Sequence, residues 1–108
     1  MIIDSHCHLE YEPMSLNLND TISRANKDGV KYLLTISTTD KSLKKILKIT
    51  KDFDCVYGTY GIHPHEAKNH KNIKSKDIIE NVGLSKKIIG IGETGLDFYY
   101  NHSEKKDQ

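Results

Sequence analysis

The sequence predicts an α/β fold with a parallel sheet, and within that class the incomplete N-terminal half of a (β/α)8 TIM barrel, forming one domain over residues 1–108. Short apolar segments alternate with helical ones in the order β-α-β-α-β-α-β, which calls for right-handed crossovers. An open doubly wound sheet shares this alternation. Polar residues follow the ends of three predicted strands, where a barrel has its active site, and no glycine-rich phosphate loop marks an open sheet. The barrel half, with about four strands and three helices, is therefore preferred.

The first quarter of the chain predicts a strand, a loop and a helix. Ile2–Cys7 has the apolar character of a short strand, and residues 9–19 form a predicted irregular loop interrupted by Pro13. Asp20 is suited to cap the first helix, because its carboxylate can accept from free N–H groups of the first turn. Gly29 is placed to end that helix in a left-handed turn.

The next segment, 30–37, is nearly continuous in apolar and β-branched residues. This composition is typical of a parallel strand that is covered on both faces. Thr39 or Asp40 can then cap a second helix. Helical spacing divides that helix into an apolar face and a lysine-rich face that is expected to be solvated, formed respectively by Leu43, Ile46, Leu47, Ile49 and by Lys44, Lys45, Lys48, Lys51.

Two further strands and one further helix are predicted in the second half of the chain. Residues 55–62 form the third strand, 75–83 a shorter helix, and 88–92 the fourth strand, which leads into Glu93. Residues 101–108 resemble the opening of a fourth helix. The pattern therefore repeats the strand–helix unit to the end of the sequence.

Composition describes a polar globular chain, with 36% hydrophobic and 29% charged residues. No long apolar run could span a bilayer, and Met1 is followed by no secretory signal, so we expect a cytoplasmic protein and no membrane partner. Cys7 and Cys55 lie in predicted strands, which favours buried, reduced thiols over a disulfide. The net charge of +1 and the scattered lysines give no basic stripe for nucleic acid.

His6 and His8 are the strongest candidates for metal ligands. One residue separates them on a predicted strand, so both imidazoles are expected on one face with Cys7 on the other. Imidazole nitrogens suit zinc, manganese and iron. The alternative for an isolated pair, one packed and one exposed histidine, is about as common. Asp4 is expected to orient a ligand histidine through a hydrogen bond, or to serve simply as a polar cap at the floor of the barrel.

Glu93 and two further histidines complete the candidate site. Glu93 follows an apolar strand and suits a carboxylate that bridges metal ions and positions the attacking water, although alone it would be an ordinary exposed glutamate. His63 and His65 follow the third strand around a proline, and substrate contact is preferred to metal ligation for them. Two solvated loop histidines are the simpler alternative, and His70 and His102 are expected to be solvated surface residues.

Three segments together resemble the signatures of the TatD family of metal-dependent hydrolases, in the same order and at similar spacing. They are Asp4 to Leu9 (DSHCHL), Gly61 to His65 (GIHPH) and Ile91 to Tyr100 (IGETGLDFYY). The resemblance extends from Met1 to the end of the sequence, and the Gly-Glu-x-Gly-Leu-Asp run is its most specific part.

The resemblance implies a metallo-dependent hydrolase of the (β/α)8 type that hydrolyses phosphodiesters of DNA. It implies one or two divalent cations, without distinguishing magnesium, manganese or zinc. On the matched positions, His6, His8 and Glu93 would be metal ligands, with Glu93 also catalytic, while His63 and His65 would line the substrate side. Asp97, which lies in the most specific motif, would contact the metal-ligating residues rather than the metal, and so would Asp4.

A complete barrel of this kind needs about 250 residues, so the sequence is expected to represent a truncated domain lacking the later ligands. Two interpretations follow. The chain is one half of a split DNase, completed by a second chain or by self-association, or it is a non-catalytic remnant. Other phosphoesterases and amidohydrolases also begin with a strand-borne HxH pair, but the Gly-Glu-Thr-Gly-Leu-Asp run argues against both.

Overall fold

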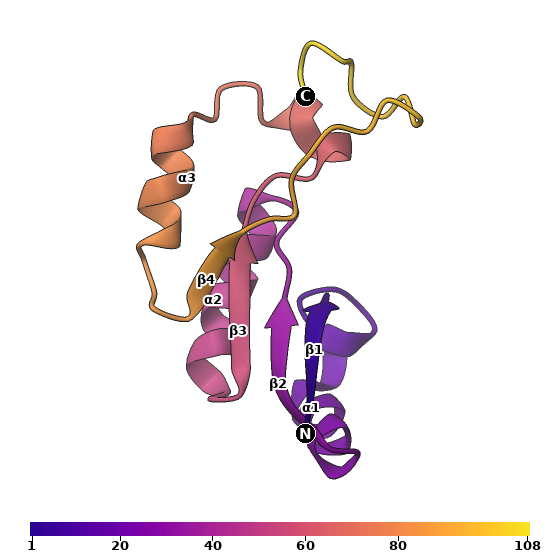
Figure 1. The fold of residues 1–108 in the computed structure, drawn as a ribbon, viewed down its shortest axis with the longest axis vertical. Helices are drawn as coiled ribbons and strands as arrows, with labels where there is room; N and C mark the ends of the chain where they lie inside the picture. The colour runs from indigo at the N-terminus through magenta and orange to yellow at the C-terminus, as the bar shows by residue number, and fades with distance from the viewer.

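A computed structural model describes residues 1–108 as a four-stranded parallel sheet with helices between the strands (Figure 1). The strand order is β1-β2-β3-β4, so β1 and β4 are the edges. All strand arrows in Figure 1 point toward the end of the molecule that carries the C-terminus. The elements are β1 (Ile2–Cys7), η1 (Met14–Asn17), α1 (Leu18–Lys27), β2 (Val30–Thr35), α2 (Asp40–Asp52), β3 (Val56–Tyr60), η2 (Pro64–Asn69), α3 (Ser75–Val82) and β4 (Ile88–Ile91).

The core lies between one face of the sheet and the helices. One cluster joins the strands β2 and β3 to α1 and α2 and consists of Leu9, Ile22, Leu33, Ile49 and Val56. A second cluster joins α2 to β3 and β4 and consists of Leu43, Ile46, Tyr60 and Ile88. The predicted apolar face of α2 therefore packs as expected, and the four lysines opposite it are exposed.

The other face of the sheet is open, which contradicts the expectation that the second strand is covered on both faces. Tyr32 in β2 is 43% exposed and Ile89 in β4 is 59% exposed. A shallow apolar hollow of about 280 Å³ runs across this face, which we call the open sheet face; it is lined by Ile3, Ser5, Tyr32, Leu33, Leu34, Tyr57 and Ile89. A continuous apolar run indicates a strand that can be buried on both faces, but it does not show which residues would cover each face.

The helix boundaries differ from the prediction at two places. Asn17, rather than Asp20, caps α1 by accepting from the N–H of Asp20, which lies within the first turn. The predicted loop before it contains the short helix η1. At the other end Gly29 has φ +92°, which confirms the left-handed turn.

The last eight residues form turns rather than the predicted opening of a helix. They fold back onto the loop after β4, because the Gln108 side chain both accepts from the Asp97 N–H and donates to the Asp97 carbonyl. Local polar contacts with this loop thus replace the i to i−4 hydrogen bonds that a helix would need.

The two cysteines are free, as predicted, but half-buried rather than buried. Burial raises the pKa of the Cys7 thiol to about 12, and the nearby carboxylates of Asp4 and Glu10 add to this effect. The thiol is therefore unreactive at neutral pH. None of the helices is both long and apolar enough to cross a membrane.

Thr39 should contribute measurably to stability, because it closes a capping box at the start of α2. Its side chain accepts from the Ser42 N–H at 3.1 Å, and the Ser42 hydroxyl accepts from the Thr39 N–H at 2.9 Å. Thr39→Ala is expected to lower the free energy of unfolding by about 1 kcal/mol in a urea titration. Thr39→Ser keeps the hydroxyl and is the control; an equal loss in both variants would contradict the role of the cap.

Candidate metal centre

The loop after β4 brings a carboxylate from one edge of the sheet to the histidines of the other edge. The Gly92 N–H donates to the carbonyl of Tyr60 at the end of β3, at 3.0 Å. The Glu93 N–H then donates to the carbonyl of Ser37, just beyond β2, at 2.7 Å. These two bonds carry the chain across the carboxyl ends of β3 and β2, so that Glu93 reaches the histidines at the carboxyl end of β1.

His6, His8 and Glu93 form the one group of potential metal ligands in the structure, with donor atoms that all lie within 4.8 Å of one another. Glu93 Oε2 is 3.6 Å from His6 Nε2 and 4.0 Å from His8 Nε2. Donor atoms bound to one ion at about 2.1 Å lie about 3.0–3.5 Å apart, so small side-chain movements suffice. Two imidazole nitrogens and a carboxylate oxygen suit zinc, manganese or iron. The residues therefore fit a divalent metal.

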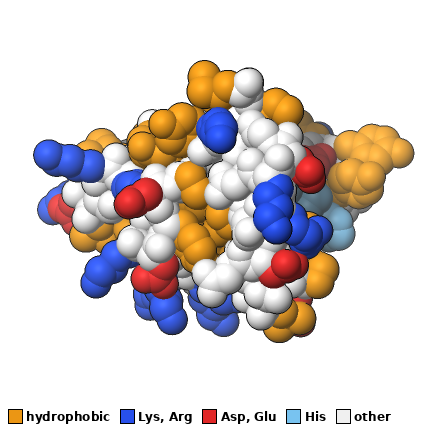
Figure 2. All heavy atoms as spheres, turned by 90° about the horizontal axis from the view of Figure 1, so that it is seen from below, with side chains coloured by type: hydrophobic (Ala, Val, Ile, Leu, Met, Phe, Trp, Pro, Cys, Tyr) orange, Lys and Arg blue, Asp and Glu red, His pale blue; other side chains and the backbone are white.

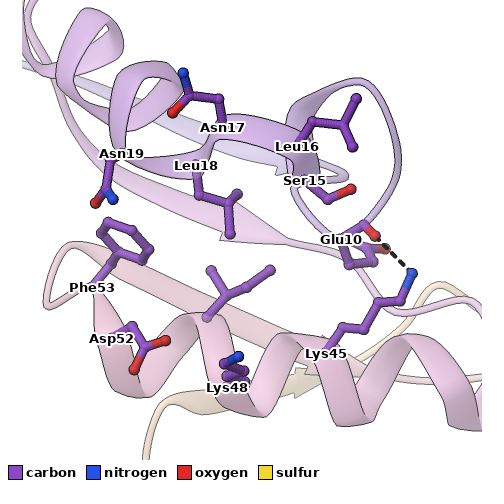
Figure 3. Close-up of a pocket in the computed structure, with 11 residues that line it drawn as sticks. Glu10, Ser15, Leu16, Asn17, Leu18, Asn19, Lys45, Lys48, Asp52 and Phe53 are labelled. Carbon is purple, nitrogen blue, oxygen red and sulfur yellow. Dashed lines mark hydrogen bonds between the residues drawn. The ribbon is translucent and has the colours of Figure 1, made fainter.

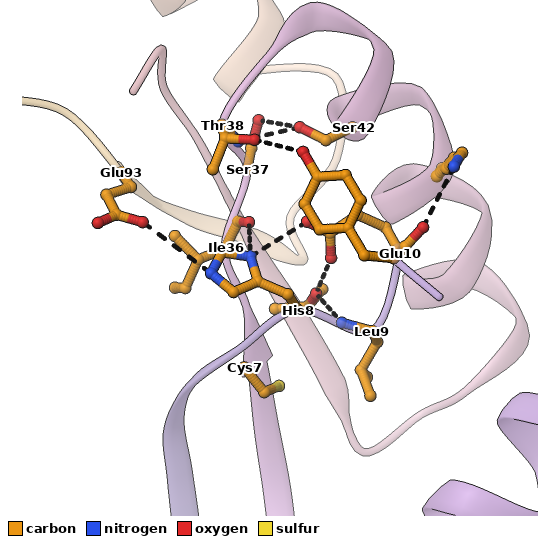
Figure 4. Close-up of polar contacts among 12 residues, drawn as sticks. Cys7, His8, Leu9, Glu10, Ile36, Ser37, Thr38, Ser42 and Glu93 are labelled. Carbon is orange, nitrogen blue, oxygen red and sulfur yellow. Dashed lines mark hydrogen bonds and ion pairs between the residues drawn. The ribbon is translucent and has the colours of Figure 1, made fainter. Parts of the chain in front are cut away.

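The orientation of the His8 ring is fixed by contacts of its Nδ1 atom, on the side of the ring away from Glu93 (Figure 4). Its Nδ1 is 3.0 Å from the carbonyl oxygen of Ile36 and 3.3 Å from Oε1 of Glu10. Because a carbonyl oxygen can only accept, Nδ1 carries the hydrogen. In the neutral ring the lone pair is then on Nε2, the atom that faces Glu93. His8 is thus held in the tautomer that a metal ligand requires.

Strand β1 is irregular where it carries the histidines, and this changes the expected position of Asp4. The pairing with β2 shifts between Asp4 and Cys7. Ser5 consequently lies on the open sheet face, whereas Cys7 packs against the helix-covered core. Asp4 Oδ1 accepts from the main-chain N–H of His6 at 3.1 Å. The sequence had suggested that Asp4 orients the imidazole of a ligand histidine. In the structure its carboxylate instead binds the backbone of β1.

His63 lies beside the ligand group but in the opposite tautomer from His8. Its Nε2 is 3.6 Å from Glu93 Oε1, the carboxylate oxygen turned away from His6 and His8. Its Nδ1 accepts from the main-chain N–H of His65 at 3.1 Å. The neutral ring therefore carries its hydrogen on Nε2 and directs an N–H donor, not a lone pair, toward the site. The nitrogen of His63 that faces the site is therefore a hydrogen-bond donor and offers no lone pair to a metal.

His65 is turned away from the ligand group toward Asp97. Its Nε2 lies 2.6 Å from Asp97 Oδ2, and the other oxygen of Asp97 accepts from the N–H groups of Tyr99 and Tyr100. The hydrogen bond from His65, followed by those of the two amides, holds the pKa of Asp97 below its usual value. Asp97 therefore supports the histidine loop after β3 rather than a predicted metal ligand.

The sequence analysis missed Glu10 and misjudged His70. Glu10 is wholly buried behind His8, and its position two residues beyond the histidine pair was the available signal. His70, expected to be solvated, has a side chain that is only 14% exposed and lies 3.9 Å from Asp40. Its Nδ1 also contacts the carbonyl of Glu66. His102 is exposed, as expected, although its ring centre lies 4.4 Å from that of His65.

Positive charge is scattered over the end of the molecule that lies opposite the metal-ligand group (Figure 2). Seen from the end where the strands begin, Lys and Arg side chains are spread around the periphery, and hydrophobic side chains reach the surface between them (Figure 2). The distribution agrees with the expectation from the net charge of +1.

Gly61 should be essential to the placement of Glu93. A Cβ atom at this position would lie 2.7 Å and 2.8 Å from the carbonyl carbon and Cα of Gly92 and 2.9 Å from the carbonyl oxygen of Glu93. Gly61→Ala must therefore displace the loop that carries Glu93. We expect a loss of about 1–3 kcal/mol in unfolding free energy from overpacking, and weaker Mn²⁺ binding in a calorimetric titration.

Gly90 provides a matched control for this substitution. Its Cβ would meet Thr59 Cγ2 at 3.6 Å, which is an ordinary contact, so Gly90→Ala should leave Mn²⁺ binding unchanged. Equal Mn²⁺ affinity in the Gly61 and Gly90 variants would show that the Glu93 loop is not held by close packing on Gly61.

Comparison with known proteins supports the resemblance noted in the sequence. The model of the family described as TatD related DNase matches residues 3–108. The chain is 38% identical over 110 residues to an uncharacterized metal-dependent hydrolase of Buchnera aphidicola subsp. Baizongia pistaciae, covering 99% of this chain and 41% of that protein. It is 27% identical to the uncharacterized metal-dependent hydrolase YcfH of Escherichia coli K12, covering 99% of this chain and 40% of YcfH.

The fold is also that of a known TatD structure. The crystal structure of YjjV, a TatD homolog from Escherichia coli K12, matches with a TM-score of 0.78 at 24% identity, over 93% of this chain and 39% of YjjV. The predicted fold class, part of a TIM barrel, is therefore confirmed. The chain spans about two fifths of the length of the relatives that it matches. The match over residues 3–108, together with this fold, establishes that the chain belongs to the TatD related DNase family.

Proposed function

We propose that this chain supplies the first part of a metal-dependent hydrolytic site that cleaves phosphodiester bonds in DNA. The observation that carries the proposal is the meeting of His6, His8 and Glu93 at the carboxyl ends of parallel strands, with donor atoms within 4.8 Å of one another. This is the end of a barrel at which active sites are built. The names of the family and of its metal-dependent relatives support the reaction class.

In this proposal His6, His8 and Glu93 hold one divalent ion. A divalent ion would supply the Lewis acidity that makes water a nucleophile at neutral pH and polarises a phosphoryl oxygen. Magnesium, manganese and zinc are all compatible with that role. The carbonyl of Ile36 keeps the His8 lone pair directed outward.

His63 is proposed to bind the substrate. Its Nε2–H points into the site beside Glu93 and can donate to a phosphate oxygen, without competing for the metal. The His65 ring packs edge-on against His63, with ring centres 4.4 Å apart, and is itself fixed by Asp97. The pair therefore presents one free donor on a rigid loop, and His65 contributes to substrate binding by holding that loop.

We further propose that another polypeptide segment covers the open sheet face in the working site. The exposed apolar side chains of Tyr32, Ile89 and Ile91 lie on an otherwise well-packed sheet whose edges β1 and β4 are unpaired. Such edges and apolar surfaces favour pairing with further strands. The covering segment is proposed to be the remainder of the barrel.

The test is hydrolysis of a labelled single-stranded DNA by the purified chain with Mn²⁺ or Mg²⁺, alone and after mixing with the remaining C-terminal portion of the Buchnera relative. His6→Gln removes one proposed ligand, and His70→Gln is the matched control because His70 faces Asp40 instead. We expect hydrolysis that EDTA and His6→Gln abolish and His70→Gln preserves.

Two results would contradict the proposal. Hydrolysis that is equal in wild type and His6→Gln would place the reaction elsewhere or in a contaminant. Absence of hydrolysis both alone and in the mixture would favour the second interpretation, a non-catalytic remnant, and a titration with Mn²⁺ would then show whether metal binding persists without turnover.

A further inference from the structure

Glu10 is the most completely buried charged residue in the chain, and the proposed reaction gives it no role. Its relative exposure is 0%, which is rare for glutamate unless a partner compensates its charge. Its Oε2 accepts from the Thr35 hydroxyl at 2.7 Å, and that hydroxyl accepts in turn from the Leu9 N–H at 3.0 Å. Its Oε1 faces His8 Nδ1 at 3.3 Å. Glu10 therefore belongs to a buried hydrogen-bond network next to His8 (Figure 4).

The only ionic partner of the Glu10 carboxylate is His8. Lys45 comes close, but its ammonium donates to the main-chain oxygen of Glu10 at 3.2 Å, as Figure 3 shows at one end of the cleft between α1 and α2. A buried carboxylate without a cation is costly, and here no Lys or Arg reaches it. The imidazole of His8 is therefore the group through which a positive charge can reach this carboxylate.

We propose that Glu10 is a positioning residue that supplies the buried negative charge behind His8 and thereby strengthens metal binding at His8 Nε2. The inference rests on the proposed metal site. The carbonyl of Ile36 already fixes the tautomer, so the contribution of Glu10 is its charge. A carboxylate hydrogen-bonded to Nδ1–H increases the electron density on Nε2 and stabilises a cation bound there.

The interaction works in both directions. If the charge of Glu10 strengthens cation binding at His8, the bound cation must in turn raise the folding stability by a larger amount when that charge is present. In a variant without the charge, the same cation raises the folding stability by less. A residue that served only to pack or to hold the loop after β1 would change the stability of the metal-free chain but not this difference. The two roles are therefore separable by experiment.

The experiment compares Mn²⁺ binding by the full chain in wild type and Glu10→Gln, with free Mn²⁺ measured by its EPR signal. Glutamine has nearly the same volume but no charge. We expect the dissociation constant for Mn²⁺ to rise about 10- to 100-fold in Glu10→Gln. The increase in unfolding temperature on adding Mn²⁺ should shrink in parallel.

Three control variants separate charge from structure. Glu12→Gln removes an exposed carboxylate two residues away and should bind Mn²⁺ as wild type does. Thr35→Val removes the hydroxyl that contacts Glu10 but keeps its charge, so it should lower the unfolding temperature of the metal-free chain with much less effect on the affinity for Mn²⁺. Glu10→Asp keeps the charge with a shorter side chain and should restore part of the affinity.

The possible outcomes are distinct. Equal Mn²⁺ affinity in wild type and Glu10→Gln, with wild type binding, would overturn the role of Glu10 and leave the metal site intact. Equal losses in Glu10→Gln and Thr35→Val would assign Glu10 a structural role only and overturn the inference as well. Absence of Mn²⁺ binding in wild type would overturn the metal site itself and this inference with it.

Discussion

Replacing Glu93 by glutamine is expected to weaken Mn²⁺ binding by at least about a hundredfold, because loss of a group that merely supports a ligand already costs 10- to 100-fold. Glu93 is the only carboxylate in the ligand group, so the variant leaves two neutral imidazoles to hold a dication. The metal-dependent hydrolysis proposed above should fall with it. Calorimetric titration with Mn²⁺ measures the effect.

The fold should be unaffected by the same substitution. The main-chain N–H of Glu93 makes the bond to Ser37 that places the loop, and glutamine retains it. The unfolding temperature without metal should therefore match that of wild type. Glu104→Gln, which removes an exposed carboxylate paired only with Lys106, is the control for the loss of one charge. If Glu93→Gln and Glu104→Gln bound Mn²⁺ equally, the metal centre would not include Glu93.

Truncation of Ile46 in the core should produce a large loss of stability. Ile46 has 0% exposure and packs between α2 and the strands β3 and β4, together with Leu43, Tyr60 and Ile88. A Cβ on Gly58 would clash with its Cγ2, so the helix lies very close to the sheet here. Ile46→Ala is expected to cost about 2–5 kcal/mol of unfolding free energy, from lost burial and the cavity that remains.

Urea denaturation followed by circular dichroism measures this loss. Since a domain of this size is stabilised by about 5–15 kcal/mol in total, the variant should have a much lower midpoint. Ile46→Val removes one methyl group and should cost about 0.5–1.5 kcal/mol. A loss below that of Ile46→Val would mean that the helix relaxes onto the sheet and that the packing of α2 is less rigid than its burial suggests.

The metal-binding proposals and the stability proposals can be tested independently. Glu93 and Glu10 act on the cation, whereas Ile46 and Thr39 act on the position of α2. The side chains of Thr39 and Glu93 share no partner, and substitutions without shared partners usually have additive effects. A variant that combines Thr39→Ala with Glu93→Gln should therefore show the stability loss of the first and the affinity loss of the second.

The sequence alone determined the order of the elements, the apolar face of α2 and the left-handed turn at Gly29. These features depend on residues near one another in the chain, through helical periodicity, capping and the conformational freedom of glycine. The sequence also indicated His6, His8 and Glu93, because parallel strands deliver their carboxyl ends to one edge of the sheet. The TatD-like motifs reinforced that choice of residues.

Only the tertiary structure decided how these residues are oriented. The tautomers of His8 and His63 depend on acceptor and donor groups of Ile36 and His65, which no pattern in the sequence predicts. Glu10 was missed because burial depends on what covers a residue, and here β2 and α2 cover it. The position of Asp4 and the open sheet face followed from strand pairing, including an irregularity in β1. Local propensity specifies each segment, whereas pairing between distant segments decides which atoms meet.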